Sequence, residues 1–370
     1  MTAGEAGQAG SLEAAMAPPP ASLTARQETQ ARRLRAARRV FLACLIYTCA
    51  ATALWLFLML TGKDGGLFFG NYRVSLQQVA NLTIFFTLFW AIYSYAFHWL
   101  KYGLLKRAGL SREELLLVFG SRLEGFDLET LLARHSERTL RIIDMIGRRG
   151  RTILLVAVSF AAVYVKARQE PTPGDLAVGL QSSLFDAMMM SWWGVLTYHS
   201  NGVLGHMSYG AHARVLDGVQ ARANALCIGT LWNAFKFVMI PIGLRLAEIY
   251  PAHTYAVLYA FIWFSYATSD FAAEIFGSLW GKHRIRVWGL GDMNRKSWAG
   301  VVAAFVCTLA VNAALVWANH LPLAWWVLGV LLAVVNPLVE LYSPRGTDDF
   351  TMATTNALIC LGYGWLVFSH

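Results

Sequence analysis

The sequence predicts an all-α, polytopic membrane protein with about nine transmembrane helices. Of its 370 residues, 56% are hydrophobic and only 14% are charged, and the mean hydropathy is +0.45. A soluble domain carries roughly 25% charged residues, so the composition argues against a soluble fold. Apolar runs close to the roughly 20 residues that cross a bilayer recur at 40–62, 79–100, 152–167, 178–198, 225–247, 254–278, 299–319, 322–342 and 352–369.

The basic residues predict the orientation of these helices. When the segments between the apolar runs are assigned alternately to two sides, one side carries 25 Lys and Arg residues and the other carries 5. Cytoplasmic loops are enriched in Lys and Arg, so the N-terminus and the loops at 279–297 and 343–351 are expected to be cytoplasmic. This topology accounts for the net charge of +9, and no nucleic-acid partner is expected.

Four regions follow from this layout. Residues 1–39 are expected to form a disordered basic cytoplasmic tail, 40–100 two transmembrane helices, 101–151 a cytoplasmic insert and 152–370 a transmembrane catalytic domain. Apolar residues at helical spacing predict two short amphipathic helices in the insert, lying on the membrane surface. Ser111 and Glu114 would begin the first as a capping box. The insert serves either anchoring and packing or a regulatory, substrate-gating role.

Other polar or reactive residues near the apolar runs carry weaker signals. The five cysteines form no CxxC pair, which argues against a zinc site or a disulfide framework. Asp186 and Lys236 lie in the fourth and fifth runs, where charged residues are costly. They predict either a structural ion pair or a contact to the polar head of a substrate.

A stripe of carboxylates and glycines ends the sixth run. Asp270, Glu274, Gly277 and Gly281 have the spacing i, i+4, i+7 and i+11, which places them on one face of a helix. Carboxylate oxygens suit Mg²⁺, which takes one or two protein carboxylates and completes its shell with water and phosphate oxygens. The alternative is an interfacial helix end with solvated acids and glycines that serve packing.

A basic loop follows this stripe directly. Lys282 and Arg284 begin it and Lys296 ends it, so cations at both ends could hold a polyphosphate. Ser297 would cap the next helix, whose N-terminus favours phosphate oxygens. The alternative is that these cations only anchor the chain on the cytoplasmic side.

A second acidic group lies near the C-terminus. Glu340 falls in the last turn of an apolar run, and Asp348, Asp349 and Thr351 begin the final run. An unpaired charge in such a run costs much free energy. These acids therefore predict a second group of metal ligands or of residues around the phosphate acceptor. The alternative for the aspartates is simple capping of a helix N-terminus.

These motifs together resemble the polyprenol and phytol kinase family, which includes farnesol and dolichol kinases and, more distantly, phosphatidate cytidylyltransferases. The resemblance covers about residues 255–370 and rests on SDFAAEIFGSLWG, NRKSWAG and VELYSPRGTDDFT. It implies Mg²⁺-dependent phosphorylation of an isoprenoid alcohol in the membrane with CTP or another nucleoside triphosphate. Two positions depart from the family pattern, since Glu274 stands where Asp is frequent and Asp349 where Asn is common.

The resemblance and the residue chemistry together assign expected roles. The expected catalytic residues are Asp270, Glu340 and Lys296, with either carboxylate orienting the acceptor hydroxyl. The expected nucleotide-binding residues are Gly277, Gly281, Lys282, Arg284, Lys296, Ser297 and Gly300, and the expected metal ligands are Asp270, Glu274, Asp348 and Asp349.

Two other functions remain open from the sequence. One is synthesis of a CDP-lipid from phosphatidate, although the Lys-Asp, His-Gly-Gly and Asp-Arg run of those enzymes is absent. The other is a non-catalytic or transport role, for which paired inverted repeats would be typical. The expected partners are a nucleotide and a membrane lipid or prenyl alcohol, and the sequence leaves open whether the chain forms a homodimer.

Overall fold

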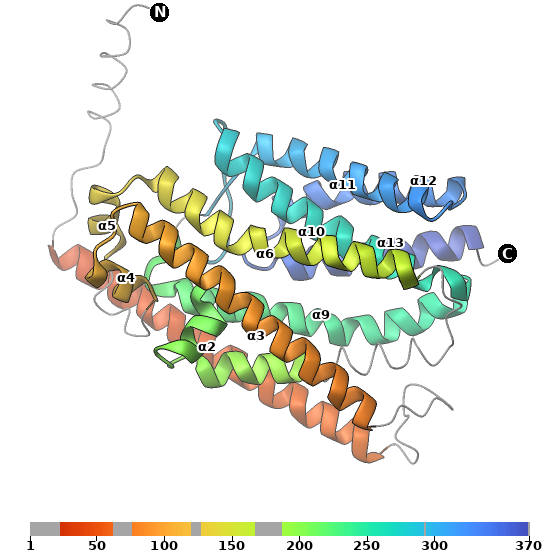
Figure 1. Cartoon of the computed structure of the whole chain (residues 1–370), viewed down its shortest axis with the longest axis horizontal. Coiled ribbons are helices and arrows are strands. Elements are labelled where there is room, and N and C mark those ends of the chain that lie inside the picture. The colour runs from red at the N-terminus through yellow and green to blue at the C-terminus, as the bar shows by residue number, and fades with distance from the viewer. Residues whose placement is uncertain (1–22, 62–75, 120–126, 167–186, 292–293, 369–370) are drawn as a thin grey trace, which may run out of the picture.

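The computed structural model describes residues 23–61, 76–119, 127–166, 187–291 and 294–368 (Figure 1). Residues 1–22 of the expected tail and Asp186 lie outside the described residues. The all-α prediction is confirmed, because the described chain is helical apart from loops and one short hairpin.

The elements follow one another in this order. They are α2 (Leu23–Thr61), α3 (Leu76–Arg107), α4 (Arg112–Phe119), α5 (Leu128–Arg134), α6 (Glu137–Lys166), α8 (Val203–Gly205), the π-helical turn η2 (His206–Gly210), η3 (Val215–Gln220), α9 (Ala221–Ile249), η4 (Ala252–Thr254), α10 (Tyr255–Trp280), β1 (Arg284–Arg286), β2 (Arg295–Ser297), α11 (Trp298–Ala318), α12 (Leu323–Tyr342) and α13 (Asp348–Phe368). Residues 187–197 are also helical.

Five segments of the described chain are long and apolar enough to cross a membrane. They are Gln27–Phe57, Val215–Ile249, Trp298–Ala318, Leu323–Tyr342 and Asp348–Phe368. These segments indicate a membrane protein, but the expected number of nine transmembrane helices is not confirmed. The sixth predicted run, in α10, falls outside the set and packs against α6, α11, α12 and α13. Its many Tyr, Trp, Ser and Thr residues make it less apolar than α11 and α12.

The N-terminal helix begins earlier than the sequence suggested. The segment 23–39, expected to be disordered, forms the first part of α2. Its Ala, Arg, Gln, Glu and Leu residues have high helix propensity, whereas disorder was expected by extension from the Ala, Gly, Pro, Ser and Gln composition of residues 1–25. Ala37 and Cys44 are buried, so the helix is held by packing.

The insert at 101–151 also differs from the expectation. Ser111 and Glu114 form the predicted capping box, with Glu114 N donating to Ser111 Oγ at 3.1 Å and Ser111 N to Glu114 Oε2 at 2.8 Å. The second predicted helix instead breaks near Ser136, and its later part continues without interruption into the third apolar run as α6. The insert therefore contains α4, α5 and the first part of α6 rather than two separate helices. Its apolar residues form a core with the end of α3 and with η3: Leu105, Leu115, Leu131, Leu140, Ile143 and Leu216.

Buried asparagines join the four C-terminal helices. Asn312 Nδ2 of α11 donates to Gly329 O of α12 at 2.9 Å, and Asn336 Nδ2 of α12 donates to Asn356 Oδ1 of α13 at 2.9 Å. Asn356 Nδ2 in turn donates to Ile262 O of α10 at 3.1 Å. Hydrogen bonds across apolar helices fix their relative positions. These bonds connect α11 to α12, α12 to α13 and α13 to α10.

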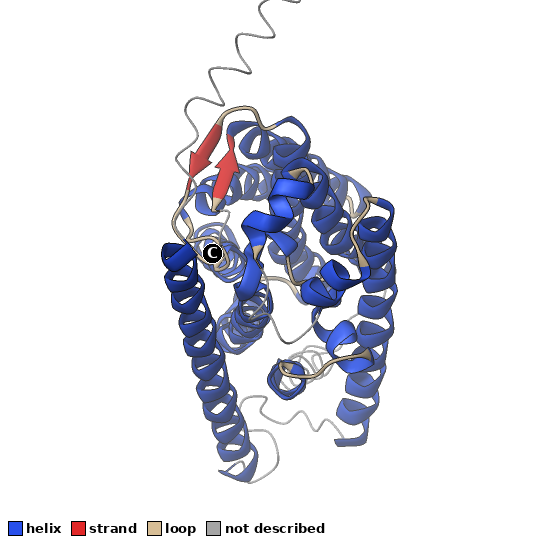
Figure 2. Cartoon of the chain, turned by 90° about the vertical axis from the view of Figure 1, so that its left-hand side faces the viewer, coloured by secondary structure: helices blue, strands red, loops and turns tan. Residues whose placement is uncertain are grey.

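The basic loop after α10 forms a two-stranded hairpin at the edge of the bundle (Figure 2). β1 and β2 are antiparallel, with Arg284 opposite Ser297 and Arg286 opposite Arg295. Beyond the strands, Leu290 N donates to Arg345 O at 2.8 Å and Arg345 N to Trp288 O at 2.8 Å. These bonds attach the hairpin to the loop between α12 and α13.

Two glycines permit this attachment. Gly289 has φ +145°, and a Cβ there would lie 2.7 Å from Arg345 Cα. Gly291 has φ +94°, and a Cβ there would lie 2.5 Å from Asp217 Oδ1. Positive φ and close backbone approach both favour glycine. The Gly289-x-Gly291 pair is therefore explained by loop packing.

Candidate functional site

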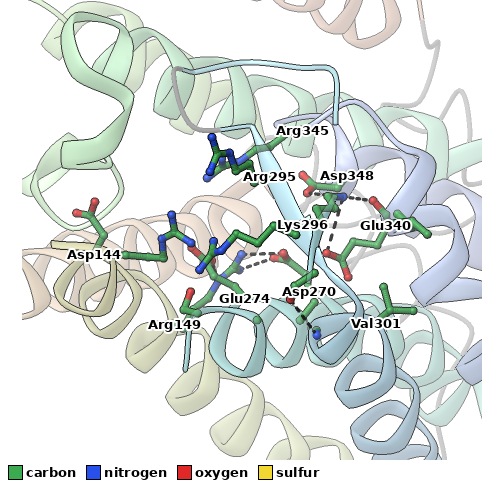
Figure 3. A pocket seen from close by; sticks show the side chains of 18 of the residues that line it. Asp144, Arg149, Asp270, Glu274, Arg295, Lys296, Val301, Glu340, Arg345 and Asp348 are labelled. Atoms are coloured by element: carbon green, nitrogen blue, oxygen red, sulfur yellow. Dashed lines mark hydrogen bonds and ion pairs between the residues drawn. The ribbon is translucent and has the colours of Figure 1, made fainter. Parts of the chain in front are cut away.

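A polar cavity opens at the end of the bundle where the hairpin covers α10 (Figure 3). The empty space within it, including the part open to solvent, is about 860 Å³. Its charged lining comes from α6, α10, the hairpin, α12 and the loops beside η3 and α13: Arg141, Asp144, Arg149, Arg214, Asp270, Glu274, Arg284, Arg295, Lys296, Glu340, Arg345 and Asp348. Residues far apart in the sequence therefore share one cavity.

Asp270 of α10 is held by Arg149 of α6. Both terminal nitrogens of the Arg149 guanidinium donate to the two oxygens of the carboxylate, one of them at 2.7 Å. Both residues are buried. Such a bidentate pair fixes the orientation of the carboxylate.

Glu274 lies in a cluster of arginines. Arg148 Nη1 donates to its two oxygens at 2.8 and 3.2 Å, and Arg149 Nε also donates to it. Arg214 Nη2 lies 3.6 Å from its Oε1. The structure therefore places this predicted metal ligand with cations from the insert and from the segment before η3.

Three other carboxylates converge instead. Asp270, Glu340 and Asp348 each offer one oxygen, and these oxygens lie within 4.8 Å of one another. Lys296 Nζ lies 3.8 Å from Glu340 Oε1 and 3.7 Å from Asp348 Oδ2, and it donates to the backbone oxygen of Glu340. Asp349, also predicted as a ligand, belongs neither to this group nor to the cavity lining. Among the described residues, the geometry thus favours Glu340 and Asp348 over Glu274 and Asp349 as companions of Asp270.

The predicted glycines bring α11 against α10. A Cβ at Gly277 or at Gly281 would lie 2.8 or 2.6 Å from Ser297 Oγ, and one at Gly300 would lie 2.7 Å from Ala273 O. Ser297 caps α11 as predicted, accepting from Gly300 N at 3.2 Å. Gly277 and Gly300 line the cavity, whereas Gly281 does not. The stripe thus lets a capped helix N-terminus lie beside the carboxylates.

The basic residues divide into those that reach the cavity and those that do not. Arg284, Arg295 and Lys296 line it, but Lys282 is exposed and lies outside the lining. Arg345 also lines it, and burial together with the nearby Arg214 lowers the pKa of Arg345 to about 10. It remains charged at neutral pH. Among the described residues, neither Arg284, Arg295 nor Arg345 forms a salt bridge.

The N-terminal half contributes residues to the site that the sequence did not predict. Arg148 and Arg149 of α6 had been assigned to a membrane-surface insert, yet they contact the carboxylates of α10. Asp144, one turn earlier, also lines the cavity and forms a buried ion pair of 2.7 Å with Lys101. The adjacent arginines immediately before an apolar run, in a chain whose acids are scarce, were the available signal.

The comparisons with known proteins identify no relative, since no protein-family model, curated protein or solved structure matches the chain. The chemistry must therefore be derived from the cavity itself. Clustered guanidinium groups and a helix N-terminus suit phosphate oxygens. Converging carboxylate oxygens suit a hard divalent cation.

Proposed function

We propose that the chain is a membrane kinase that phosphorylates a lipid alcohol from a nucleoside triphosphate with Mg²⁺. The observation that supports it best is the convergence of Asp270, Glu340 and Asp348 from three helices. They meet in a cavity that is also lined by seven Lys and Arg side chains. In phosphoryl transfer the protein mainly positions the two substrates and neutralises the charge of the phosphates. This cavity is suited to both roles.

The arginines without salt bridges would bind the phosphates. Arg345 and Arg284 line the cavity beside Lys296, and a guanidinium binds phosphate oxygens through two donors at once. The N-terminus of α11, capped by Ser297, adds a positive dipole end at the same place. These groups would hold a polyphosphate and stabilise the charge on the transferred group.

The three converging carboxylates fit a magnesium ion. With ligands at about 2.1 Å, neighbouring oxygens around Mg²⁺ lie about 3 Å apart and opposite ones about 4 Å apart. Small side-chain movements bring oxygens now within 4.8 Å of one another to such spacings. Asp270 can bind Arg149 and a metal together, because each carboxylate oxygen has two acceptor sites. When bound, the metal would supply neutralisation of phosphate charge.

Glu340 is the better placed of the two candidate bases. Both oxygens of Asp270 already accept from Arg149, whereas the described partner of the Glu340 carboxylate is Lys296 at 3.8 Å. In the proposed step the acceptor oxygen bonds to the terminal phosphorus and the bond to the nucleoside diphosphate breaks. The hydroxyl proton passes to Glu340. Lys296 lies where it would balance the charge of the carboxylates.

The identity of the two substrates rests on the resemblance of the C-terminal motifs. That resemblance favours CTP as donor and an isoprenoid alcohol of the phytol, farnesol or polyprenol type as acceptor. The cavity lies at the end of α10, beside three helices of membrane-spanning length and composition. An acceptor could thus keep its chain among apolar helices and present only its hydroxyl. We further propose that the site faces the cytoplasm, where nucleotides are abundant, in line with the positive-inside bias.

The test is transfer by the purified full-length chain. Radiolabelled CTP, ATP and UTP would be supplied with phytol, farnesol, dolichol, diacylglycerol and phosphatidate. Transfer of label to an alcohol would support the kinase. Formation of a CDP-lipid from phosphatidate would instead indicate that the chain is a nucleotidyltransferase. Asp270→Asn should abolish transfer while the protein still inserts into membranes. Asp127→Asn, at the N-cap of α5 and outside the cavity lining, is the matched control and should retain activity.

A further inference from the structure

The outward face of the hairpin has a composition that the proposed reaction does not explain. Exposure alternates along residues 284–288, so Arg284, Arg286 and Trp288 point outward while Ile285 and Val287 are partly buried. Val287 N donates to Asn294 O at 3.0 Å, which continues the strand pairing toward Trp288. Alternate residues of a strand share a face. One face of the hairpin therefore presents basic side chains and a tryptophan.

Two arginines of the hairpin lie opposite each other on neighbouring strands. Arg286 lies directly opposite Arg295 in the strand register, and like charges in that position destabilise a sheet. Within the described part of the chain, neither guanidinium has a carboxylate in salt-bridge range. An external anion would relieve this repulsion.

Exposed tryptophans lie on the hairpin and at the two helix ends that flank it in the chain. Trp288 is 81% exposed, and Trp280 and Trp298, at the end of α10 and the start of α11, are 60% and 55% exposed. Trp is enriched at the membrane–water interface, where its ring meets the lipid headgroups. The hairpin lies at the edge of the helical bundle (Figure 2), and α11 is one of the membrane-length helices. These positions suit the headgroup level of a bilayer.

We propose that this face binds the phosphate group of an anionic phospholipid. Arg286 and Arg295 would hold the phosphate, and Trp288 would lie among the headgroups beside it. Arg295 and Arg284 also reach the cavity, but Arg286 and Trp288 do not line it. The lipid site therefore adjoins the cavity and can be altered separately from it. The proposal does not depend on which reaction the cavity performs.

The test is lipid retention by the purified full-length chain, measured by native mass spectrometry with phosphatidylglycerol or phosphatidylcholine added. The unaltered chain should retain phosphatidylglycerol in preference to phosphatidylcholine. Arg286→Gln should lower that retention about fivefold, the factor that corresponds to about 1 kcal/mol per basic residue at an anionic surface. Trp288→Ala should also lower it. Arg286→Lys should keep most of it, because the charge remains.

Arg245→Gln is the matched control. Arg245 is an exposed basic residue near the end of α9, paired with Glu248 at 2.7 Å, and its loss should leave lipid retention unchanged. Equal retention of both lipids by the unaltered chain would overturn the proposal. The proposal would also be wrong if Arg286→Gln weakened CTP binding and left phosphatidylglycerol retention unchanged, because the face would then bind the nucleotide. Displacement of the lipid by millimolar inorganic phosphate would also overturn it, because a free phosphate would then suffice.

Discussion

Arg149 binds both oxygens of the Asp270 carboxylate, and its Nε also donates to Glu274. One guanidinium from α6 thus compensates two carboxylates on successive turns of α10. Ion pairs between buried groups are costly to break from one side, because the remaining charge is left without a partner. The site and the stability of the fold therefore depend on the same side chain.

Loss of this arginine should destabilise the protein strongly. Arg149→Met is expected to lower the free energy of unfolding by about 3–5 kcal/mol, the usual cost of leaving a buried charge unpaired. Combining it with Asp270→Asn and Glu274→Gln should recover much of that loss. Thermal denaturation in detergent, with Arg245→Met as control, measures both effects. A single variant as stable as the unaltered chain would contradict the ion-pair network.

Metal binding should separate the two neighbouring aspartates. Asp348→Asn is expected to weaken binding of Mn²⁺ at least tenfold, because it removes one of three converging ligands. Asp349→Asn should retain it, since Asp349 is outside that group. Electron paramagnetic resonance titration with Mn²⁺ as a probe for Mg²⁺ distinguishes them. If Asp349→Asn weakened Mn²⁺ binding and Asp348→Asn did not, Asp349 rather than Asp348 would be the metal ligand.

The glycines at the contact between α10 and α11 should tolerate no side chain. Gly281→Ala is expected to cost about 1–3 kcal/mol, the typical penalty for overpacking, because its Cβ would lie 2.6 Å from Ser297 Oγ. Gly362→Ala in α13, where a Cβ meets nothing within 4 Å, should be stabilising by about 0.5–1 kcal/mol through helix propensity. Denaturation midpoints of the two variants should move in opposite directions.

The buried asparagines should contribute to stability through bonds between helices. Asn312→Ala removes the donor to Gly329 O and the acceptor for Ser265 Oγ, and we expect a loss of about 1–2 kcal/mol. Asn319→Ala is the control, because the partner of Asn319 Nδ2 among the described residues is Leu315 O of the same helix. An equal effect of the two changes would show that the interhelical bonds add little.

Stability should fall as the solution is acidified below about pH 6.5, partly because of His212. Burial, with Arg151 and Arg148 nearby, holds the pKa of His212 well below its usual 6.5. The unfolded chain then takes up a proton near pH 6.5 that the folded chain does not, so stability is present above that pH and is lost below it. One group contributes at most about 1.4 kcal/mol per pH unit. His212→Gln should flatten the dependence of the unfolding midpoint between pH 7 and 5; an unchanged slope would contradict this account.

The sequence predicted the helical class because that class depends on local patterns. Apolar runs marked the positions of most helices, and the capping roles of Ser111 and Ser297 followed from residue type and spacing. The partners of Glu274 could not be predicted in this way. Arg148 and Arg149 lie more than 120 residues from it, and although their position before an apolar run was a signal, that position does not indicate which carboxylate they bind. For the same reason, the helical spacing of Asp270 and Glu274 placed them on one face but did not show that Glu340 would replace Glu274 beside Asp270.

Because α6 runs unbroken from Glu137 to Lys166, a division of the chain at residue 152, where the catalytic domain was expected to begin, would cut this helix in two. A fragment starting at residue 152 would keep the C-terminal sequence motifs but would lose Arg148 and Arg149, which bind Asp270 and Glu274. Its acids would repel one another inside an otherwise apolar bundle. The smallest portion able to assemble the cavity therefore begins before α6, and the first half of the protein is as much a part of the site as the half that carries its motifs.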